Sequence, residues 1–137
     1  GWRVVQEERL VHGQRHGEYK KYECDGNVWI TCHYVNGKKG GEYKEFYFSS
    51  DQVMIQSFYV NGKKEGRHTE FFETGGIQEV CYYTNGKKDG ELRNWLENGQ
   101  LTRKCFYVNG KLHGEYKGWY ENGQIHEHRF YVSGAIE

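Results

Sequence analysis

The sequence repeats itself about every 24 residues, and this period constrains the fold more than any other feature. The clearest copy runs from Gly110 to Ser133, GKLHGEYKGWYENGQIHEHRFYVS, and aligned copies begin at Gly13, Gly37, Gly62 and Gly86. The Gly37 copy alone is one residue longer. A period in this range is typical of repeat arrays, in which each unit buries its surface against its neighbours.

The repeats fill almost all of the 137 residues, which leaves no space for a separate catalytic module. We therefore expect one domain over residues 1–137. It divides into a half copy at 4–12, full copies at 13–36, 37–61, 62–85, 86–109 and 110–133, and a partial copy at 134–137.

Each copy contains two runs rich in Tyr, Phe, Trp and Val, separated by turn dipeptides. Asn or Asp followed by Gly is a strong hairpin signal, because both residues tolerate the positive φ angles of a type I′ turn. One set of these dipeptides closes the copies and a second set lies within them: Asn36-Gly37, Asn61-Gly62, Asn85-Gly86 and Asn109-Gly110; then Asp25-Gly26, Asn98-Gly99 and Asn122-Gly123. The pattern predicts an all-β fold, an open, elongated, twisted single-layer antiparallel β-meander of about eleven strands.

The strand register follows from placing Glu121 opposite Gln124 across the second type of turn. One surface of the sheet then carries Gly and Tyr in every copy: Gly114, Tyr116, Tyr120, Ile125 and Tyr131, with Tyr19, Val28, Tyr34, Tyr43, Tyr47, Val53 and Tyr59 in earlier copies. A Gly opposite a Tyr leaves space for the ring to lie over the backbone. We expect this surface to be the tightly packed one.

The other surface alternates charged side chains with aromatic rings, which form two predicted stripes along the array. These residues are Tyr22, Phe46, Phe71, Trp95 and Trp119 in one stripe, and Phe58, Tyr82, Phe106 and Phe130 in the other. Two interpretations remain open for them. The rings pack on one another to stiffen a thin sheet, or they form the contact surface for a protein partner.

The charge pattern argues against nucleic-acid and membrane partners. Lys and Arg total 19, and Asp and Glu also total 19, so a phosphate backbone would meet repulsion as often as attraction. No apolar stretch approaches the roughly 20 residues of a membrane span, and no basic cluster indicates lipid binding. The first and last strands, VVQEERLVH and IHEHRFYVS, are rich in charge, so at most a weak homo-oligomer through the edge strands is expected.

Candidate chemical groups are few. Cys32, Cys81 and Cys105 share one repeat position, about 10 Å apart on alternate strands, which is too far for a disulfide. Free thiols favour an intracellular, cytoplasmic protein. His126 and His128 supply only two ligands where a structural zinc ion needs about four, so neither a metal nor a cofactor is expected. Without a nucleophile–base set or a phosphate-binding loop, the chain is not expected to be an enzyme.

Short motifs recur at fixed spacing: GEYK at 17–20, 41–44 and 114–117, YVNGK at 34–38, 59–63 and 107–111, and ENGQ at 97–100 and 121–124. They resemble the MORN repeat, in the longer variant of YwqK-type proteins, over residues 4–137. The resemblance implies stacked β-hairpins that serve as a scaffold or interaction module. YwqK-type members are described as antitoxins in bacterial toxin systems, and similar arrays are frequent in large DNA viruses.

Two neighbouring copies depart from this pattern. The Gly62 copy reads GRHTEFFETGG, with His68 in place of Tyr and no Asn-Gly turn, and the Gly37 copy has Ser49-Ser50-Asp51 at that turn. Ordinary drift of the repeat is the favoured explanation, and a local bend or a specialised contact at these two copies is the alternative.

The leading hypothesis is a noncatalytic protein–protein interaction or scaffold module that presents aromatic stripes to a protein partner of unknown identity. Two alternatives stay open. One is an antitoxin or immunity-type protein that neutralises a toxin, and the other is a structural spacer that assembles with copies of itself.

Overall fold

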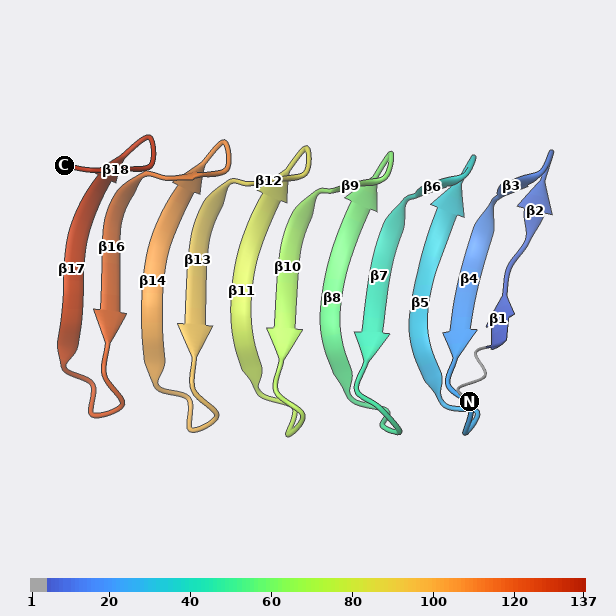
Figure 1. Cartoon of the computed structure of the whole chain (residues 1–137), viewed down its shortest axis with the longest axis horizontal. Coiled ribbons are helices and arrows are strands. Elements are labelled where there is room, and N and C mark those ends of the chain that lie inside the picture. The colour runs from blue at the N-terminus through green and yellow to red at the C-terminus, as the bar shows by residue number, and fades with distance from the viewer. Residues whose placement is uncertain (1–4) are drawn as a thin grey trace.

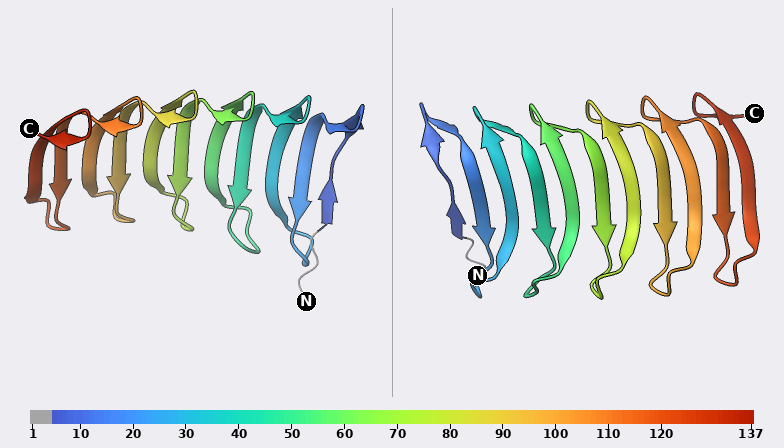
Figure 2. Two further views of the ribbon diagram at one scale, coloured as in Figure 1. Left: turned by 45° about the horizontal axis from the view of Figure 1, so that its top comes forward. Right: turned by 180° about the vertical axis from the view of Figure 1, so that it is seen from behind.

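A computed structural model describes residues 5–137, except the side chain of Val5. The described residues form one large antiparallel sheet that stays open, as Figures 1 and 2 show. Eleven main strands follow one another across it in chain order: β1 (Val5–Glu7), β4 (Gly17–Tyr22), β5 (Val28–Val35), β7 (Gly41–Phe46), β8 (Val53–Val60), β10 (Gly66–Phe71), β11 (Ile77–Thr84), β13 (Gly90–Trp95), β14 (Leu101–Val108), β16 (Gly114–Trp119) and β17 (Ile125–Val132). The predicted fold class is confirmed. Within residues 5–137, no helix has the length and apolar character needed to cross a membrane.

Two-residue strands form a second row along one end of the sheet (Figure 2). These are β2 (Leu10–Val11) with β3 (Gln14–Arg15), and then β6 (Lys38–Lys39), β9 (Lys63–Lys64), β12 (Lys87–Lys88), β15 (Lys111–Leu112) and β18 (Ala135–Ile136), each paired with the end of the preceding long strand. The turn Gly of one copy also donates a hydrogen bond to the preceding short strand, as in Gly86 N to Lys64 O at 2.9 Å. The short strands therefore link neighbouring copies.

The two sets of turns differ in conformation. Asn61 and Gly62 both have positive φ, 50° and 80°, so the type I′ prediction is confirmed for the set that closes the copies. In the other set only Gly has positive φ, as at Gly99 with 89°. At this loop the Gly99 amide donates a hydrogen bond to the Leu96 carbonyl, and the Leu96 amide donates one to the Gln100 carbonyl, at 2.9 Å each. The type I′ prediction is wrong for this set, which forms three-residue loops ending in a left-handed Gly.

The predicted register is confirmed away from these loops. Gly118 lies opposite Glu127 as expected, but the next pair is Trp119 with Ile125, so one residue of β17 is bulged out. The same shift occurs in each long hairpin: Tyr22 opposite Val28, Phe46 opposite Val53, Phe71 opposite Ile77, and Trp95 opposite Leu101.

Because of this bulge, the prediction of which surface of the sheet carries each side chain is wrong for part of the residues. Cross-strand partners share a face, so Val28, Val53 and Ile125 lie with the Trp and Phe rings, whereas the sequence analysis placed them with the Tyr rings. The extra residue breaks the alternation of faces. Thus each hairpin carries one additional aliphatic side chain on the Trp and Phe side.

The core lies on the other surface, which we call the Tyr face. It is defined by Tyr19, Tyr34, Tyr43, Tyr59, Tyr83, Tyr107, Tyr116 and Tyr131, together with the buried residues between them. Leu92, Cys81 and Cys105 form the most buried cluster. Rings on neighbouring strands meet edge to face, as in Tyr43 and Tyr59 with centroids 5.8 Å apart. The prediction of a tightly packed surface is confirmed.

The short strands cover one end of the Tyr face. Lys39 Nζ lies 4.9 Å from the Tyr43 ring centroid and 5.2 Å from that of Tyr59. Lys64 and Lys88 lie over Tyr83 and Tyr107 in the same way, at 5.0 and 5.2 Å. A cation over the face of a ring is attracted by the electron density of the ring, so β6, β9 and β12 are each held against the core beneath them.

Candidate functional site

The nine aromatic residues predicted as a contact surface lie on one side of the sheet, which we call the Trp/Phe face. It comprises Tyr22, Phe46, Phe58, Phe71, Tyr82, Trp95, Phe106, Trp119 and Phe130. The register pairs Phe58 with Glu42, Tyr82 with Arg67, Phe106 with Glu91, and Phe130 with Glu115. None of the nine side chains is buried, and the exposed fraction reaches 48% at Phe130.

Charged side chains of the Trp/Phe face pair with one another along single strands. Lys20 and Glu18 lie 3.3 Å apart, and the same spacing of two residues joins other pairs: Lys44 with Glu42, Arg93 with Glu91, and Lys117 with Glu115. These residues alternate with the rings because every second residue of a strand points to the same side. The face therefore combines apolar rings with charge that is locally neutralised.

An apolar hollow of about 500 Å³ lies between the first two loops at the other end of the long strands. Its lining is Glu23, Cys24, Trp29, Phe46, Tyr47, Phe48 and Met54. The loop of the Gly37 copy reaches back to the preceding copy here, since the Ser49 amide donates a 3.0 Å hydrogen bond to the Glu23 carboxylate. The sequence departure at Ser49-Ser50-Asp51 thus coincides with a contact between copies.

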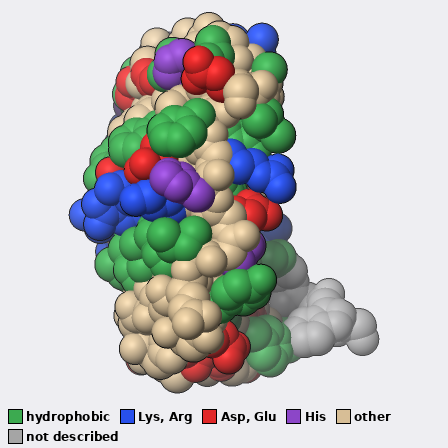
Figure 3. Space-filling view, turned by 90° about the vertical axis from the view of Figure 1, so that its left-hand side faces the viewer, with side chains coloured by type: hydrophobic (Ala, Val, Ile, Leu, Met, Phe, Trp, Pro, Cys, Tyr) green, Lys and Arg blue, Asp and Glu red, His purple; other side chains and the backbone are tan. Residues whose placement is uncertain are grey.

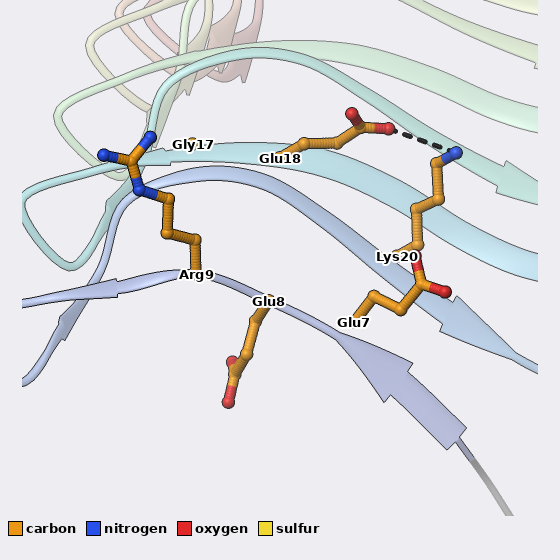
Figure 4. Close-up of a pocket in the computed structure, with 6 residues that line it drawn as sticks. All are labelled: Glu7, Glu8, Arg9, Gly17, Glu18 and Lys20. Carbon is orange, nitrogen blue, oxygen red and sulfur yellow. Dashed lines mark ion pairs between the residues drawn. The ribbon is translucent and has the colours of Figure 1, made fainter.

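A second hollow, of about 380 Å³, lies at the amino-terminal edge and is lined by Glu7, Glu8, Arg9, Gly17, Glu18 and Lys20 (Figure 4). Charges of both signs surround it. Lys20 pairs with Glu18, as the dashed line marks, and Glu8 pairs with Arg15. These residues include no nucleophile beside a base, so the arrangement is that of a solvated, charged sheet edge.

The His68 substitution brings together a polar cluster on the Tyr face that the sequence analysis missed. His68 Nε2 lies 3.7 Å from the Glu70 carboxylate, and Glu70 lies opposite Glu79 on β11. The Glu79 carboxylate accepts a 2.9 Å hydrogen bond from Asn94 and lies 3.5 Å from Arg103 Nη2. The sequence signal for this cluster is the register, which pairs Glu70 with Glu79 and places two carboxylates on the inward surface.

Burial and mutual hydrogen bonding shift the pKa values in this cluster. Burial lowers the pKa of His68 to about 4, so its ring is neutral at pH 7. The hydrogen bond with Glu79, together with burial, raises the pKa of Glu70 to about 7. For Glu79 burial raises the pKa, but the hydrogen bonds from Glu70 and Asn94 outweigh it and the pKa is lowered.

The other candidate ligands, His126 and His128, contact different groups. The His126 ring lies 4.8 Å from that of Tyr120, and His128 Nε2 lies 3.0 Å from a carboxylate oxygen of Glu115. Because each ring has its own neighbour, the described structure does not bring the two together with further ligands.

The cysteines have the predicted state. All four are free, with Cys24 exposed and the three at the shared repeat position buried. Burial raises the pKa of Cys81 to about 11, so this thiol stays protonated near neutral pH.

Comparison with known protein families decides the identity of the array. A family model described as a MORN repeat variant matches residues 15–36, 64–85, 88–109 and 112–133, which is more than half of the chain. The chain belongs to this family. The MORN repeat variant is generally a noncatalytic module, and its matched segments leave out residues 37–63, where the longer copy lies. No curated protein matches the chain.

Proposed function

We propose that this MORN repeat protein is a noncatalytic interaction scaffold that presents its Trp/Phe face to a protein partner. The observation that carries the proposal is the contrast between its two faces. Both are rich in aromatic rings. Rings of the Tyr face meet one another across strands, whereas on the Trp/Phe face Phe106 and Phe130 contact Lys104 and His128 of their own strands.

On the Tyr face the rings already have partners within the chain. Tyr19 and Tyr34 meet edge to face at 5.6 Å, and Arg15 lies over both rings at 5.2 and 5.5 Å. Further along the array, Tyr116 and Tyr131 meet at 5.9 Å. These contacts support a structural role for the Tyr face.

On the Trp/Phe face the rings recur once per copy and retain exposed surface, 37% at Phe58 and 41% at Tyr82. Equivalent strands are about 10 Å apart, so each stripe is an extended row of apolar side chains. Trp, Tyr and Phe are enriched at the centres of protein interfaces, where few residues provide most of the binding energy. The paired charges between the rings contribute specificity more than affinity.

The antitoxin role is a narrower form of this proposal and rests on family resemblance alone. The free buried thiols support a reducing, intracellular site of action. A protein partner, rather than nucleic acid or membrane, fits a face whose charges cancel in pairs.

A self-assembling spacer is the second candidate, favoured by the open edges of the sheet at β1 and β17. Figure 3 views the molecule from the carboxyl-terminal end, where acidic, basic and His side chains are interspersed with hydrophobic ones. Charged edge strands discourage pairing with further strands. This feature favours the interaction scaffold over the spacer.

The test combines affinity capture from the native host with sedimentation of the purified protein. The wild type captures a protein that the double variant Trp95→Ala/Trp119→Ala, folded by circular dichroism, retains poorly. Tyr120→Ala is the matched control, because Tyr120 is 57% exposed and lies outside the predicted stripes. If the wild type instead forms larger species as its concentration rises and captures only its own copies, the spacer hypothesis holds.

A further inference from the structure

Three potential metal ligands converge on the Tyr face at the hairpin of β10 and β11. They are His68, Glu70 and Glu79, whose ligand atoms all lie within 4.8 Å of one another. His68 and Glu70 alternate along β10, and Glu79 lies opposite Glu70 on β11. The pairing of the two strands therefore holds all three side chains on one side of the sheet.

This set occurs in one copy of the array. The equivalent positions of the other copies hold Tyr19, Lys21 and Ile30; Tyr43, Glu45 and Ile55; Leu92, Asn94 and Arg103; and Tyr116, Gly118 and Glu127. None of these sets combines an imidazole with two carboxylates. The preceding copy shares one of these groups, since Glu45 is equivalent to Glu70, but of the copies compared only the Gly62 copy combines this carboxylate with His68 and Glu79.

The orientation of His68 is fixed by a second group. The residue is 6% exposed, and Ser57 Oγ lies 2.5 Å from Nδ1. This contact leaves Nε2 facing Glu70 at 3.7 Å, which is longer than a hydrogen bond. Metal-binding His residues commonly have their other ring nitrogen held by a neighbouring group in this way.

The spacing of the ligand atoms suits an ion at their centre. Ligand atoms bound tetrahedrally to Zn²⁺ at 2.0–2.2 Å lie about 3.4 Å from one another. The distance of 3.7 Å between His68 and Glu70 is close to that value, and a separation at the upper limit of 4.8 Å requires the ligand atoms to move closer when the ion binds.

Cations from neighbouring strands lie around the cluster, and the charges of Lys64 and Lys88 act on His68 and Glu70. Arg103 and Asn94 contact one oxygen of Glu79, Oε1, from the side of the next copy. The ammonium groups of Lys64 and Lys88 lie over the rings of Tyr83 and Tyr107, at 5.0 and 5.2 Å from the centroids.

We propose that His68, Glu70 and Glu79 bind one divalent transition-metal ion of the zinc class, with water in the remaining coordination position. An imidazole with carboxylates suits such an ion, and Ser57 acts as the outer group that orients the imidazole. The bound ion joins β10 to β11 and stabilises the hairpin of the Gly62 copy.

The test is calorimetric titration of the full chain, treated with chelator and then dialysed, with ZnCl₂ in a buffer without phosphate. The wild type binds one equivalent, and the ion raises the melting temperature. His68→Tyr removes a ligand and installs the residue that Tyr19 and Tyr43 supply elsewhere, so the variant is expected to fold. Glu70→Gln removes a charged ligand with little change of shape. Each variant loses at least about tenfold in affinity.

Glu115→Gln is the matched control, because Glu115 contacts His128 at 3.0 Å and offers only a two-ligand pair. It binds zinc like the wild type. Failure of the wild type to bind would overturn the proposal, and so would unchanged binding by folded His68→Tyr or Glu70→Gln. Loss of binding in Glu115→Gln would assign the ion to the carboxyl-terminal His residues and would overturn it equally.

Discussion

The amide nitrogen of Gly62 donates a hydrogen bond of 2.8 Å to the carbonyl oxygen of Lys39. The same bond recurs between other copies, from Gly37 to Arg15 and from Gly110 to Lys88, at 2.8 Å in both cases. The turn that reverses the chain in one copy therefore also attaches it to the preceding copy. The Asn-Gly dipeptides therefore connect neighbouring repeats in addition to forming each turn.

Replacing Gly114 by Ala is expected to destabilise the fold by about 1–2 kcal/mol, because Gly114 has a φ of 89° and Ala adopts the left-handed region at a cost. No atom lies within 4 Å of the added methyl group, so crowding does not contribute. Gly118→Ala is the control, since its φ is not left-handed and the methyl meets the movable end of His126 at 3.1 Å. Urea unfolding measures both, and an equal loss would contradict the backbone explanation.

Lys39→Ala is expected to cost about 1 kcal/mol, because the ammonium group and the stem of Lys39 cover two Tyr rings of the core. The adjacent Lys38 is exposed, and among the described residues its ammonium group does not lie over an aromatic ring. Lys38→Ala should change stability by less than about 0.5 kcal/mol. Thermal unfolding of the two variants separates them, and equal melting temperatures would contradict the covering role of the short strand.

Leu92→Ala is expected to destabilise the protein by about 2–5 kcal/mol, since Leu92 is completely buried against Cys81 and Cys105. Tyr120→Ala removes a larger side chain that is 57% exposed and should cost much less. Chemical denaturation measures both. A Leu92→Ala variant as stable as the Tyr120→Ala variant would show that the Tyr face is not the core.

The buried thiol of Cys81 makes stability depend on pH in the alkaline range. Its pKa in the folded chain is about 11, against 9.0 for an ordinary thiol. Between these values the unfolded chain loses the proton and the folded chain keeps it, so stability falls as pH rises from 9 to 11. A rise of this size corresponds to roughly 3 kcal/mol.

Cys81→Ser removes this titration and places at residue 81 the side chain that Ser57 supplies in the preceding copy. Urea unfolding at pH 8 and pH 10.5 should therefore show a smaller alkaline loss in the variant than in the wild type. Alkylation at pH 8 gives a second measurement, in which exposed Cys24 reacts quickly and Cys81 slowly. Equal alkaline losses in the two proteins would contradict the raised pKa.

The sequence predicted the array, the number of main strands and most of the register, because Asn-Gly dipeptides and alternating rings are local signals. The pairing of Gly118 with Glu127 is one example. It did not predict the bulge beside the loop at Gly123, since a Gly with positive φ fits both a type I′ turn and a three-residue loop. The conformation of the preceding Asn122 decides between them, and both loops accept Asn there.

The coverage of the Tyr face was likewise beyond prediction. Lys39 follows a turn by two residues and reads in sequence as a solvated charge, but the short strand directs it onto two rings. In the sequence, His68 marks only a departure from the repeat. Its chemistry depends on Glu70 and Glu79, which the register brings opposite each other. In both cases the structure depends on a contact between two residues, and neither residue type alone indicates that contact in the sequence.

The most direct test of the central claim is the affinity of the captured partner for the Trp/Phe face, measured by biolayer interferometry on folded variants. Trp95→Ala/Trp119→Ala is expected to weaken binding by about 30-fold or more, equivalent to at least about 2 kcal/mol, while Tyr120→Ala is expected to bind like the wild type. Equal affinity of the double variant and the wild type would contradict the assignment of this face as the partner surface.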